Sequence, residues 1–238
     1  MPRCPFATWQ PIPPQLELER EVPRHGVETK TQIILHTAVG NLRGSLDWWR
    51  DRFAWGVYAT FFVLRSGEIV QLVDSSFKAN ANGSANRRAI SVETEDNGHP
   101  ELYPWSDKQL EALSNLVRWA SGEHAIPIRP CSAIDGAGIG FHTMWGNTPG
   151  RNSWLAQHAK TCPGVPRIEQ FYANVLPTLG YTPAATEIDE MFARWTADPR
   201  RAATSTTPAL RDPARHPTRH RRHVALDQPF TRRRGHHK

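Results

Sequence analysis

Gln32-Ile33-Ile34-Leu35 is a short apolar run with β-branched residues, and the fold is most easily worked out from it. Polar Lys30-Thr31 precedes the run, and His36-Thr37-Ala38-Val39-Gly40 follows it. Such a pattern is typical of a buried β-strand that leads into a loop. His36 is therefore expected at the carboxyl end of a strand.

Further strands are expected downstream of this run. Residues 57–64 and 68–73 flank Arg65-Ser66-Gly67, which predicts two strands joined by a tight turn. In residues 89–95, apolar Ile90 and Val92 alternate with polar side chains at the period of a strand. One face of that strand would carry Ser91, Glu93 and Glu95.

Helical patterns lie between and after these strands. Residues 45–53 suit a short helix with Ser45 as N-cap, and Ser106 suits the N-cap of a helix that reaches about residue 121, with Gly122 as its stop. Residues 167–179 and 187–195 also have helical spacing, whereas residues 127–164 are rich in Gly and Pro and are expected to be irregular. The fold class predicted is α/β, with a central mixed β-sheet flanked by helices.

Charge and composition divide the chain into four parts. The net charge is +6, yet residues 1–196 carry 18 Lys and Arg against 20 Asp and Glu, while residues 197–238 carry 11 against 3. That basic tail has few large apolar residues, so we expect it to be disordered. The expected parts are an N-terminal extension (1–24), a globular domain (25–180), a short helical segment (181–196) and the tail (197–238).

The basic tail would attract polyanions in a salt-dependent and nonspecific way. No base-reading motif is apparent, so we expect no specific nucleic-acid partner. The chain has no transmembrane stretch and no apolar signal-peptide region near its start, and its three cysteines argue against a disulfide framework. Synthesis in a cytoplasm, without a signal peptide, is expected.

A metal site is suggested by the residue types present. Catalytic zinc takes three protein ligands from His, Cys or carboxylate and keeps a fourth position open to water. His36, His142 and Cys162 meet that need. Eleven His and three Cys allow many other triples, so the residues alone leave the choice open.

Four motifs in a fixed order resemble a known family. They are the strand ending in His36-Thr37, the strand–turn–strand around Arg65-Ser66-Gly67, the Ile-Ser-Val-Glu strand of residues 89–95, and Gly140-Phe141-His142 followed by Lys160-Thr161-Cys162-Pro163. From about residue 32 to residue 179 the chain is similar to the amidase-2 family. That family contains phage lysozyme-type amidases, cytosolic anhydromuropeptide amidases and the related peptidoglycan recognition proteins.

The resemblance implies a zinc-dependent N-acetylmuramoyl-L-alanine amidase in which His36, His142 and Cys162 bind Zn²⁺. Glu93 would transfer protons and Lys160 would stabilise the oxyanion. Residues 25–180 would then be the catalytic domain and bacterial peptidoglycan the substrate. We expect a monomeric phage endolysin that reaches the cell wall after the membrane has been permeabilised.

Three rival functions stay open. They are a cytosolic amidase that recycles anhydromuropeptides, a peptidoglycan-binding protein without catalysis, and a nucleic-acid-binding protein driven by the tail. The presence of Cys162 speaks against the binding protein, because a lost zinc site would lack that ligand.

One position departs from the family pattern. The Tyr that phage members often carry in the first hairpin strand corresponds here to Ala59, and Tyr58 is one residue away. A one-residue shift on a strand turns a side chain to the opposite face. We therefore expect Tyr58 to be a packing residue, favour Glu93 for proton transfer, and regard Thr60 as the next candidate to line the cleft.

Other side chains are compatible with structural or functional roles. His158 is expected at the surface or behind the ligands, and Cys131 as a small buried apolar residue that could instead touch the metal or pair with Cys4. Sugar stacking and core packing are equally open for the tryptophans, and substrate hydrogen bonds and ordinary loop chemistry for the asparagines. These residues are Trp48, Trp49, Trp55, Asn80, Asn82 and Asn86.

Overall fold

A computed structural model describes residues 2–11, 27–51, 58–145 and 162–196. The chain divides into two compact units, Met1–Ser205 and Thr206–Lys238, and all described residues belong to the first. The predicted disordered tail therefore lies outside the described residues, as do Trp55, His158 and Lys160. Among the described helices, none is both long and apolar enough to cross a lipid bilayer.

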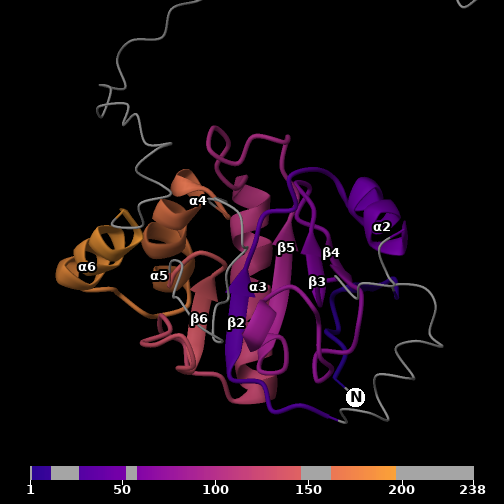
Figure 1. Ribbon diagram of the computed structural model, residues 1–238, viewed down its shortest axis with the longest axis horizontal. Coiled ribbons are helices and arrows are strands. Elements are labelled where there is room, and N and C mark those ends of the chain that lie inside the picture. The colour runs from indigo at the N-terminus through magenta and orange to yellow at the C-terminus, as the bar shows by residue number, and fades with distance from the viewer. Residues whose placement is uncertain (1, 12–26, 52–57, 146–161, 197–238) are drawn as a thin grey trace, which may run out of the picture. The chain divides into compact units, whose positions relative to one another are not determined.

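A mixed β-sheet forms the centre of the described structure (Figure 1). Within the described residues it has six strands in the order β1-β4-β3-β5-β2-β6. Neighbouring strands are parallel except β3 and β4, which form the antiparallel pair predicted on either side of residues 65–67. The strands are β1 (Thr8–Trp9), β2 (Gln32–Leu35), β3 (Phe61–Val63), β4 (Ile69–Gln71), β5 (Ala89–Thr94) and β6 (Gly138–Phe141).

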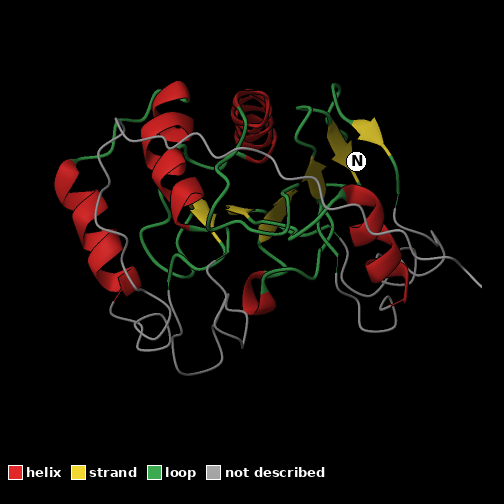
Figure 2. Ribbon diagram, turned by 90° about the horizontal axis from the view of Figure 1, so that it is seen from above, coloured by secondary structure: helices red, strands yellow, loops and turns green. Residues whose placement is uncertain are grey.

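Helices cover both faces of the sheet, as a largely parallel sheet requires (Figure 2). Helix α3 (Asp107–His124) packs on one face, where Phe61 and Val63 belong to the main hydrophobic core. Helix α2 (Leu42–Asp51) covers the other face, and its Trp49 packs with Phe62 of β3 in a second core cluster. Alternate residues of β3 thus serve opposite cores. The α/β fold class predicted from the sequence is confirmed.

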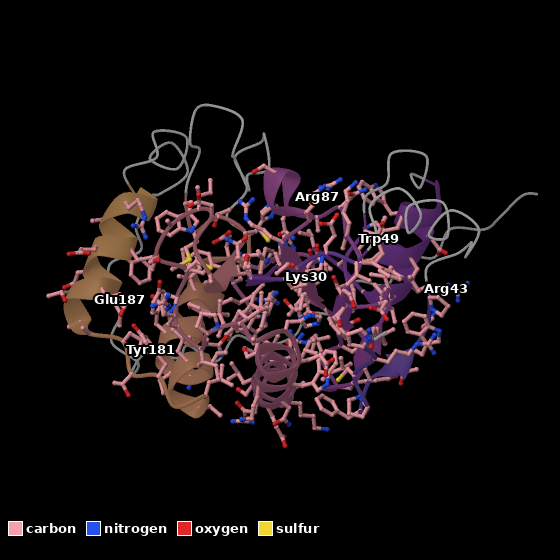
Figure 3. The ribbon with its side chains drawn as sticks, turned by 90° about the horizontal axis from the view of Figure 1, so that it is seen from below. Lys30, Arg43, Trp49, Arg87, Tyr181 and Glu187 are labelled. Atoms are coloured by element: carbon pink, nitrogen blue, oxygen red, sulfur yellow. The ribbon has the colours of Figure 1, made fainter. Side chains whose placement is uncertain are left out.

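A nearly continuous helical stretch follows residue 164. It consists of α4 (Val165–Gln170), a π-helical turn (Phe171–Val175) and α5 (Leu176–Thr178). Pro177 has no N–H and would clash with the carbonyl of an ordinary preceding turn, and a π turn is one way in which a helix absorbs such a residue. The final helix α6 (Ala185–Thr196) is joined to the preceding loop by a 2.9 Å hydrogen bond from the Tyr181 hydroxyl to Glu187 (Figure 3).

The ends of two helices differ from the sequence prediction. Helix α2 begins at Leu42 rather than near Ser45, because the Asn41 side chain accepts a 2.8 Å hydrogen bond from the Gly44 backbone N–H and so caps the helix earlier. Ser106 does cap α3, through a reciprocal hydrogen-bond pair with Gln109. However, α3 continues through Gly122 to His124, and the left-handed residue that ends it is Ala125.

Two strands were not predicted. Residues 127–164, expected to be irregular, contain β6, whose glycines hid its strand character because glycine has low strand propensity. Within the expected N-terminal extension, Thr8 and Trp9 pair with Val70 and Gln71 as strand β1. Part of that extension therefore adds an edge strand to the sheet.

Candidate metal centre

The register of three parallel strands brings the central residues of the site together. Leu35 of β2 pairs with Val92 of β5 on one side and with Phe141 of β6 on the other. The next residue along each strand is His36, Glu93 and His142, respectively. Because the strands are parallel, His36, Glu93 and His142 each come directly after one set of paired residues and lie side by side at the carboxyl edge of the sheet.

The three predicted metal ligands converge at this edge. One donor atom from each of His36, His142 and Cys162 lies within 4.8 Å of the others. The two imidazole rings have their centroids 4.3 Å apart, and Cys162 arrives from the turn that precedes α4. Two imidazole nitrogens and one sulfur are the donor set that zinc accepts in catalytic sites, with bonds of about 2.0–2.3 Å. The residues present therefore fit a zinc ion.

Backbone and hydroxyl donors hold Cys162 in place. The Thr37 backbone N–H donates a 3.2 Å hydrogen bond to the Cys162 sulfur, and the Thr143 hydroxyl donates a 2.7 Å hydrogen bond to the Cys162 carbonyl. Thr37 follows His36 and Thr143 follows His142 in the chain. The residues next to the two histidines thus position the third ligand, which links the three ligand segments.

Glu93 lies beside the candidate ligands. Its Oε1 is 3.9 Å from Nδ1 of His36, and its side chain is 14% exposed. Glu95, two residues along the same strand, is instead a hydrogen-bond acceptor for the backbone N–H of Arg65 at 2.9 Å. The two carboxylates therefore have different surroundings, and Glu93 is the one that lines the pocket described below.

A pocket of about 720 Å³ opens over the ligands. Tyr58 lines it, although its hydroxyl donates a 3.1 Å hydrogen bond to the Lys78 carbonyl and its side chain packs in the second core cluster. Thr60 is fully buried, and its hydroxyl oxygen accepts a hydrogen bond from the Ser91 N–H. The structure thus places Thr60 among the strands and not on the described pocket wall.

Helix α2 contributes two tryptophans to the lining of the pocket, beside Gly44 and Ser45. Trp48 lines it and is 46% exposed, whereas Trp49 is mostly buried against Phe62. Val39 also lines the pocket, is exposed, and has a φ of 52°, a backbone conformation that β-branched residues seldom adopt. Such strain is common near functional sites.

The remaining described candidates from the sequence do not line the pocket. Cys131 is buried in the main core and is a free thiol, as is Cys4, so the two do not pair. Burial raises the pKa of the Cys131 thiol to about 12. Asn80 and Asn86 bond to one another within their loop, whereas Asn82 reaches His36.

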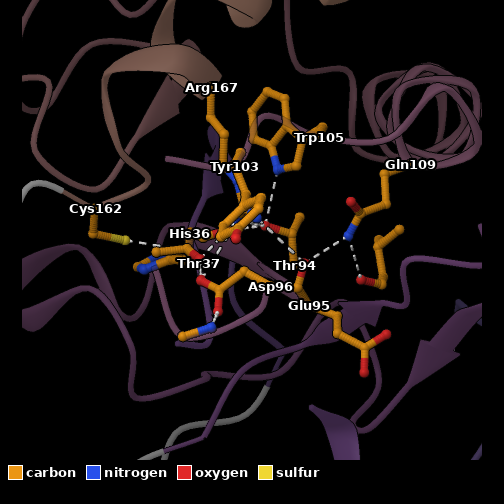
Figure 4. A network of polar contacts seen from close by, with 12 residues as sticks. His36, Thr37, Thr94, Glu95, Asp96, Tyr103, Trp105, Gln109, Cys162 and Arg167 are labelled. Atoms are coloured by element: carbon orange, nitrogen blue, oxygen red, sulfur yellow. Dashed lines mark hydrogen bonds and ion pairs between the residues drawn. The ribbon is translucent and has the colours of Figure 1, made fainter. Parts of the chain in front are cut away.

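A buried ionic network supports the site from behind (Figure 4). The Arg167 side chain is fully buried and donates hydrogen bonds to the hydroxyl oxygens of Thr37 and Thr94, at 2.6 Å and 3.0 Å. The Thr37 hydroxyl donates in turn to Asp96, whose carboxylate lies 3.9 Å from the guanidinium. Burial lowers the pKa of Arg167 to about 10, and the nearby charges of Asp96 and Cys162 oppose that shift. The sequence did not indicate this network, because a single Arg in a helical pattern predicts an exposed side chain.

The family model described as N-acetylmuramoyl-L-alanine amidase matches residues 26–165, which is more than half of the chain. The chain belongs to this amidase family. The matched range contains His36, His142 and Cys162 together with Glu93 and Lys160, so every predicted site residue falls in the amidase segment.

Several solved structures are similar to this amidase family member at low sequence identity. The endolysin N-acetylmuramoyl-L-alanine amidase LysCS from Clostridium intestinale URNW is 16% identical, with 72% of this chain and 95% of that chain covered and a TM-score of 0.49. The Staphylococcus aureus hydrolase AmiA, in complex with its ligand, is 14% identical, with 78% and 80% covered and a TM-score of 0.41. The Drosophila peptidoglycan recognition protein SD is 13% identical, with 62% and 83% covered and a TM-score of 0.42. A comparison with curated protein sequences returned no match.

Proposed function

We propose that the protein is a zinc-dependent N-acetylmuramoyl-L-alanine amidase that hydrolyses the amide bond between N-acetylmuramic acid and L-alanine in bacterial peptidoglycan. The observation that carries this proposal is the convergence of donor atoms of His36, His142 and Cys162 within 4.8 Å, with Glu93 next to His36 in the lining of a pocket. Membership of the amidase family supports the reaction class.

The side chains divide the chemistry between them. Zinc held by the three ligands would lower the pKa of a bound water towards about 7 and polarise the amide carbonyl. Glu93 would take a proton from the attacking water and pass it to the leaving amine of L-alanine. Lys160, which lies outside the described residues, is proposed to stabilise the negative charge that develops on the carbonyl oxygen.

The decisive experiment is digestion of purified peptidoglycan with and without a zinc chelator, followed by mass spectrometry of the released ends. The proposal predicts new L-alanine amino termini, muramic acid with a free lactyl carboxylate, and no products after chelation. Elemental analysis should find one zinc ion per chain. Intact muramoyl–alanine bonds beside cut glycan strands or cut cross-bridges would contradict it.

Matched variants separate metal binding from proton transfer. Cys162→Ser should lose zinc and activity together, because a hydroxyl is a poor substitute for a thiolate ligand. Glu93→Gln should keep zinc and lose turnover by a factor of about 10² or more. Glu95→Gln is the control, since Glu95 lies on the same strand but contacts the Arg65 backbone. Retained turnover in Glu93→Gln would move the proton-transfer role to another group.

We also propose that the enzyme is a phage endolysin, made in the host cytoplasm and acting on the wall once the membrane is permeabilised. The 11 Lys and Arg of residues 197–238 support attachment to an anionic wall. Full chain and residues 1–196 should then cleave soluble muropeptides equally, while only the full chain is retained on intact walls at low salt. A preference for soluble anhydromuropeptides over intact walls would favour the recycling role instead.

A further inference from the structure

Asn82 is a fully buried amide next to His36, and the reaction described above does not use it. It directly precedes a short 3-10 turn (Gly83–Ala85) in the loop that leads to β5. Its Oδ1 lies 2.7 Å from Nε2 of His36, and its Nδ2 donates a hydrogen bond to the Ser91 hydroxyl. Its backbone N–H donates a 2.7 Å hydrogen bond to Asn86. Partners on three sides therefore fix the position of this amide.

The two ring nitrogens of His36 have different neighbours. Nε2 faces the Asn82 amide at 2.7 Å, whereas Nδ1 faces Glu93 at 3.9 Å. A ring nitrogen that binds a metal must be unprotonated, so in a neutral imidazole the other nitrogen carries the proton. If Nε2 carries it, Nε2–H donates to Asn82 Oδ1 and Nδ1 presents its lone pair on the Glu93 side.

We propose that Asn82, locked by Ser91, is a positioning residue that fixes the tautomer and ring orientation of His36 for zinc binding through Nδ1. The inference rests on the zinc site of the proposed function. Partners of this kind hold metal-binding histidines in the correct orientation, and their loss typically weakens metal binding by about 10–100-fold.

Ser91 ties this device to the rest of the site. It lies on β5 two residues before Glu93, so both side chains project from the same face of one strand. Strand β5 therefore contributes both the proposed proton carrier and the anchor of the amide that orients His36. A shift of β5 would move both groups together relative to His36.

The first test uses the unaltered, zinc-loaded protein. Nuclear magnetic resonance of the histidine ring nitrogens should show His36 with its proton on Nε2 and with Nδ1 bound to zinc. A proton on Nδ1 would overturn the inference. If the protein binds no stoichiometric zinc, the proposed function fails at this step, which separates that failure from a failure of the role of Asn82.

The second test measures zinc affinity by competition with a chromophoric chelator. Asn82→Leu, which keeps a similar volume and removes the acceptor, should weaken zinc binding by about 10–100-fold. Asn82→Asp restores an acceptor for Nε2–H and should bind zinc at least as tightly as the unaltered protein. Asn80→Leu is the control, because Asn80 belongs to the same loop and bonds to Asn86.

Unfolding of the metal-free variants shows whether a loss of affinity reflects a loss of fold. Asn82→Leu should remain folded without zinc, and its defect should appear in zinc affinity and in the His36 tautomer. Equal zinc affinity in Asn82→Leu and Asn80→Leu would overturn the proposal. If Asn82→Leu does not fold, two results decide the matter: the zinc affinity of Asn82→Asp and the tautomer of His36 in the unaltered protein.

Discussion

Replacing Arg167 by Met tests whether the buried network behind the site acts as one unit. The guanidinium of Arg167 is fully buried and donates to Thr37, to Thr94 and to the Tyr103 carbonyl at 3.2 Å, with the Asp96 carboxylate 3.9 Å away. Removing it leaves Asp96 buried without its cation. Breaking a buried ion pair on one side typically costs about 3–5 kcal/mol. We expect Arg167→Met to lower the free energy of unfolding by that amount.

The double-mutant cycle with Asp96→Asn makes this prediction specific. Asp96→Asn leaves Arg167 buried without its anion, whereas the double variant removes both charges. If the network is one unit, the double variant should lose about 1–3 kcal/mol less than the sum of the single variants. Urea unfolding followed by tryptophan fluorescence, in the presence of chelator so that zinc does not add stability, measures all four proteins. Losses that add within about 0.5 kcal/mol would refute the reasoning.

Four further predictions concern other parts of the fold. Burial lowers the pKa of Lys30 to about 8, so between pH 8 and about 10.4 the unfolded chain binds more protons than the folded one. The free energy of unfolding, relative to that of Lys30→Met, should therefore rise by about 3 kcal/mol over this pH range. Free energies of unfolding that change with pH in parallel in the two proteins would contradict this. Gly122 lies inside α3 with open space around it, so Gly122→Ala should stabilise by about 0.5–1 kcal/mol in thermal or urea unfolding, and a loss of stability would contradict the helix boundary. Ala125 has a φ of 52°, so Ala125→Gly should stabilise by about 1 kcal/mol. Gly138→Ala should destabilise, because its Cβ would lie 2.5 Å from the Arg129 carbonyl oxygen, and the same unfolding measurement checks both.

The sequence predicted the elements whose signals are local. Strand β2 is a short apolar run, and Ser106 is a favoured N-cap residue just before the helical spacing of α3. Strand β6 has no such signal, because glycines occupy two of its four positions and its identity depends on pairing with β2 across about a hundred residues. The predicted start of α2 was wrong for another reason. Asn41 and Ser45 are both good N-caps, and only the folded backbone selects Asn41.

The three metal ligands were predicted through the family motifs and not through the residue types alone. Cys162 lies 20 residues after His142, and His142 lies 106 residues after His36, so no local spacing marks them as one site. Their roles, and that of Glu93, stay predictions, and Lys160 lies outside the described residues. For Asn82 the sequence left substrate hydrogen bonds and ordinary loop chemistry open and did not indicate a contact with His36, because that contact depends on how a loop folds over β5. The sequence alone could not show that His36, Glu93 and His142 lie side by side, because this depends on the register of three strands.

The polar partners of the predicted ligands also bear on the proposed zinc site. His36 is held by a neutral amide, and the Cys162 sulfur by a backbone N–H, so neither of these partners adds negative charge. In the proposed site, zinc bound to two neutral imidazoles and one thiolate would keep a net positive charge, whereas a carboxylate at the position of Asn82 would bring a compensating negative charge close to it. A positive site polarises a carbonyl and favours ionisation of water more strongly. The Asp96 carboxylate, which balances the charge of Arg167, accepts a hydrogen bond from the Thr37 hydroxyl and lies next to the guanidinium. In the proposed zinc site, Glu93 is then the carboxylate that lies beside a ligand, with its Oε1 3.9 Å from Nδ1 of His36.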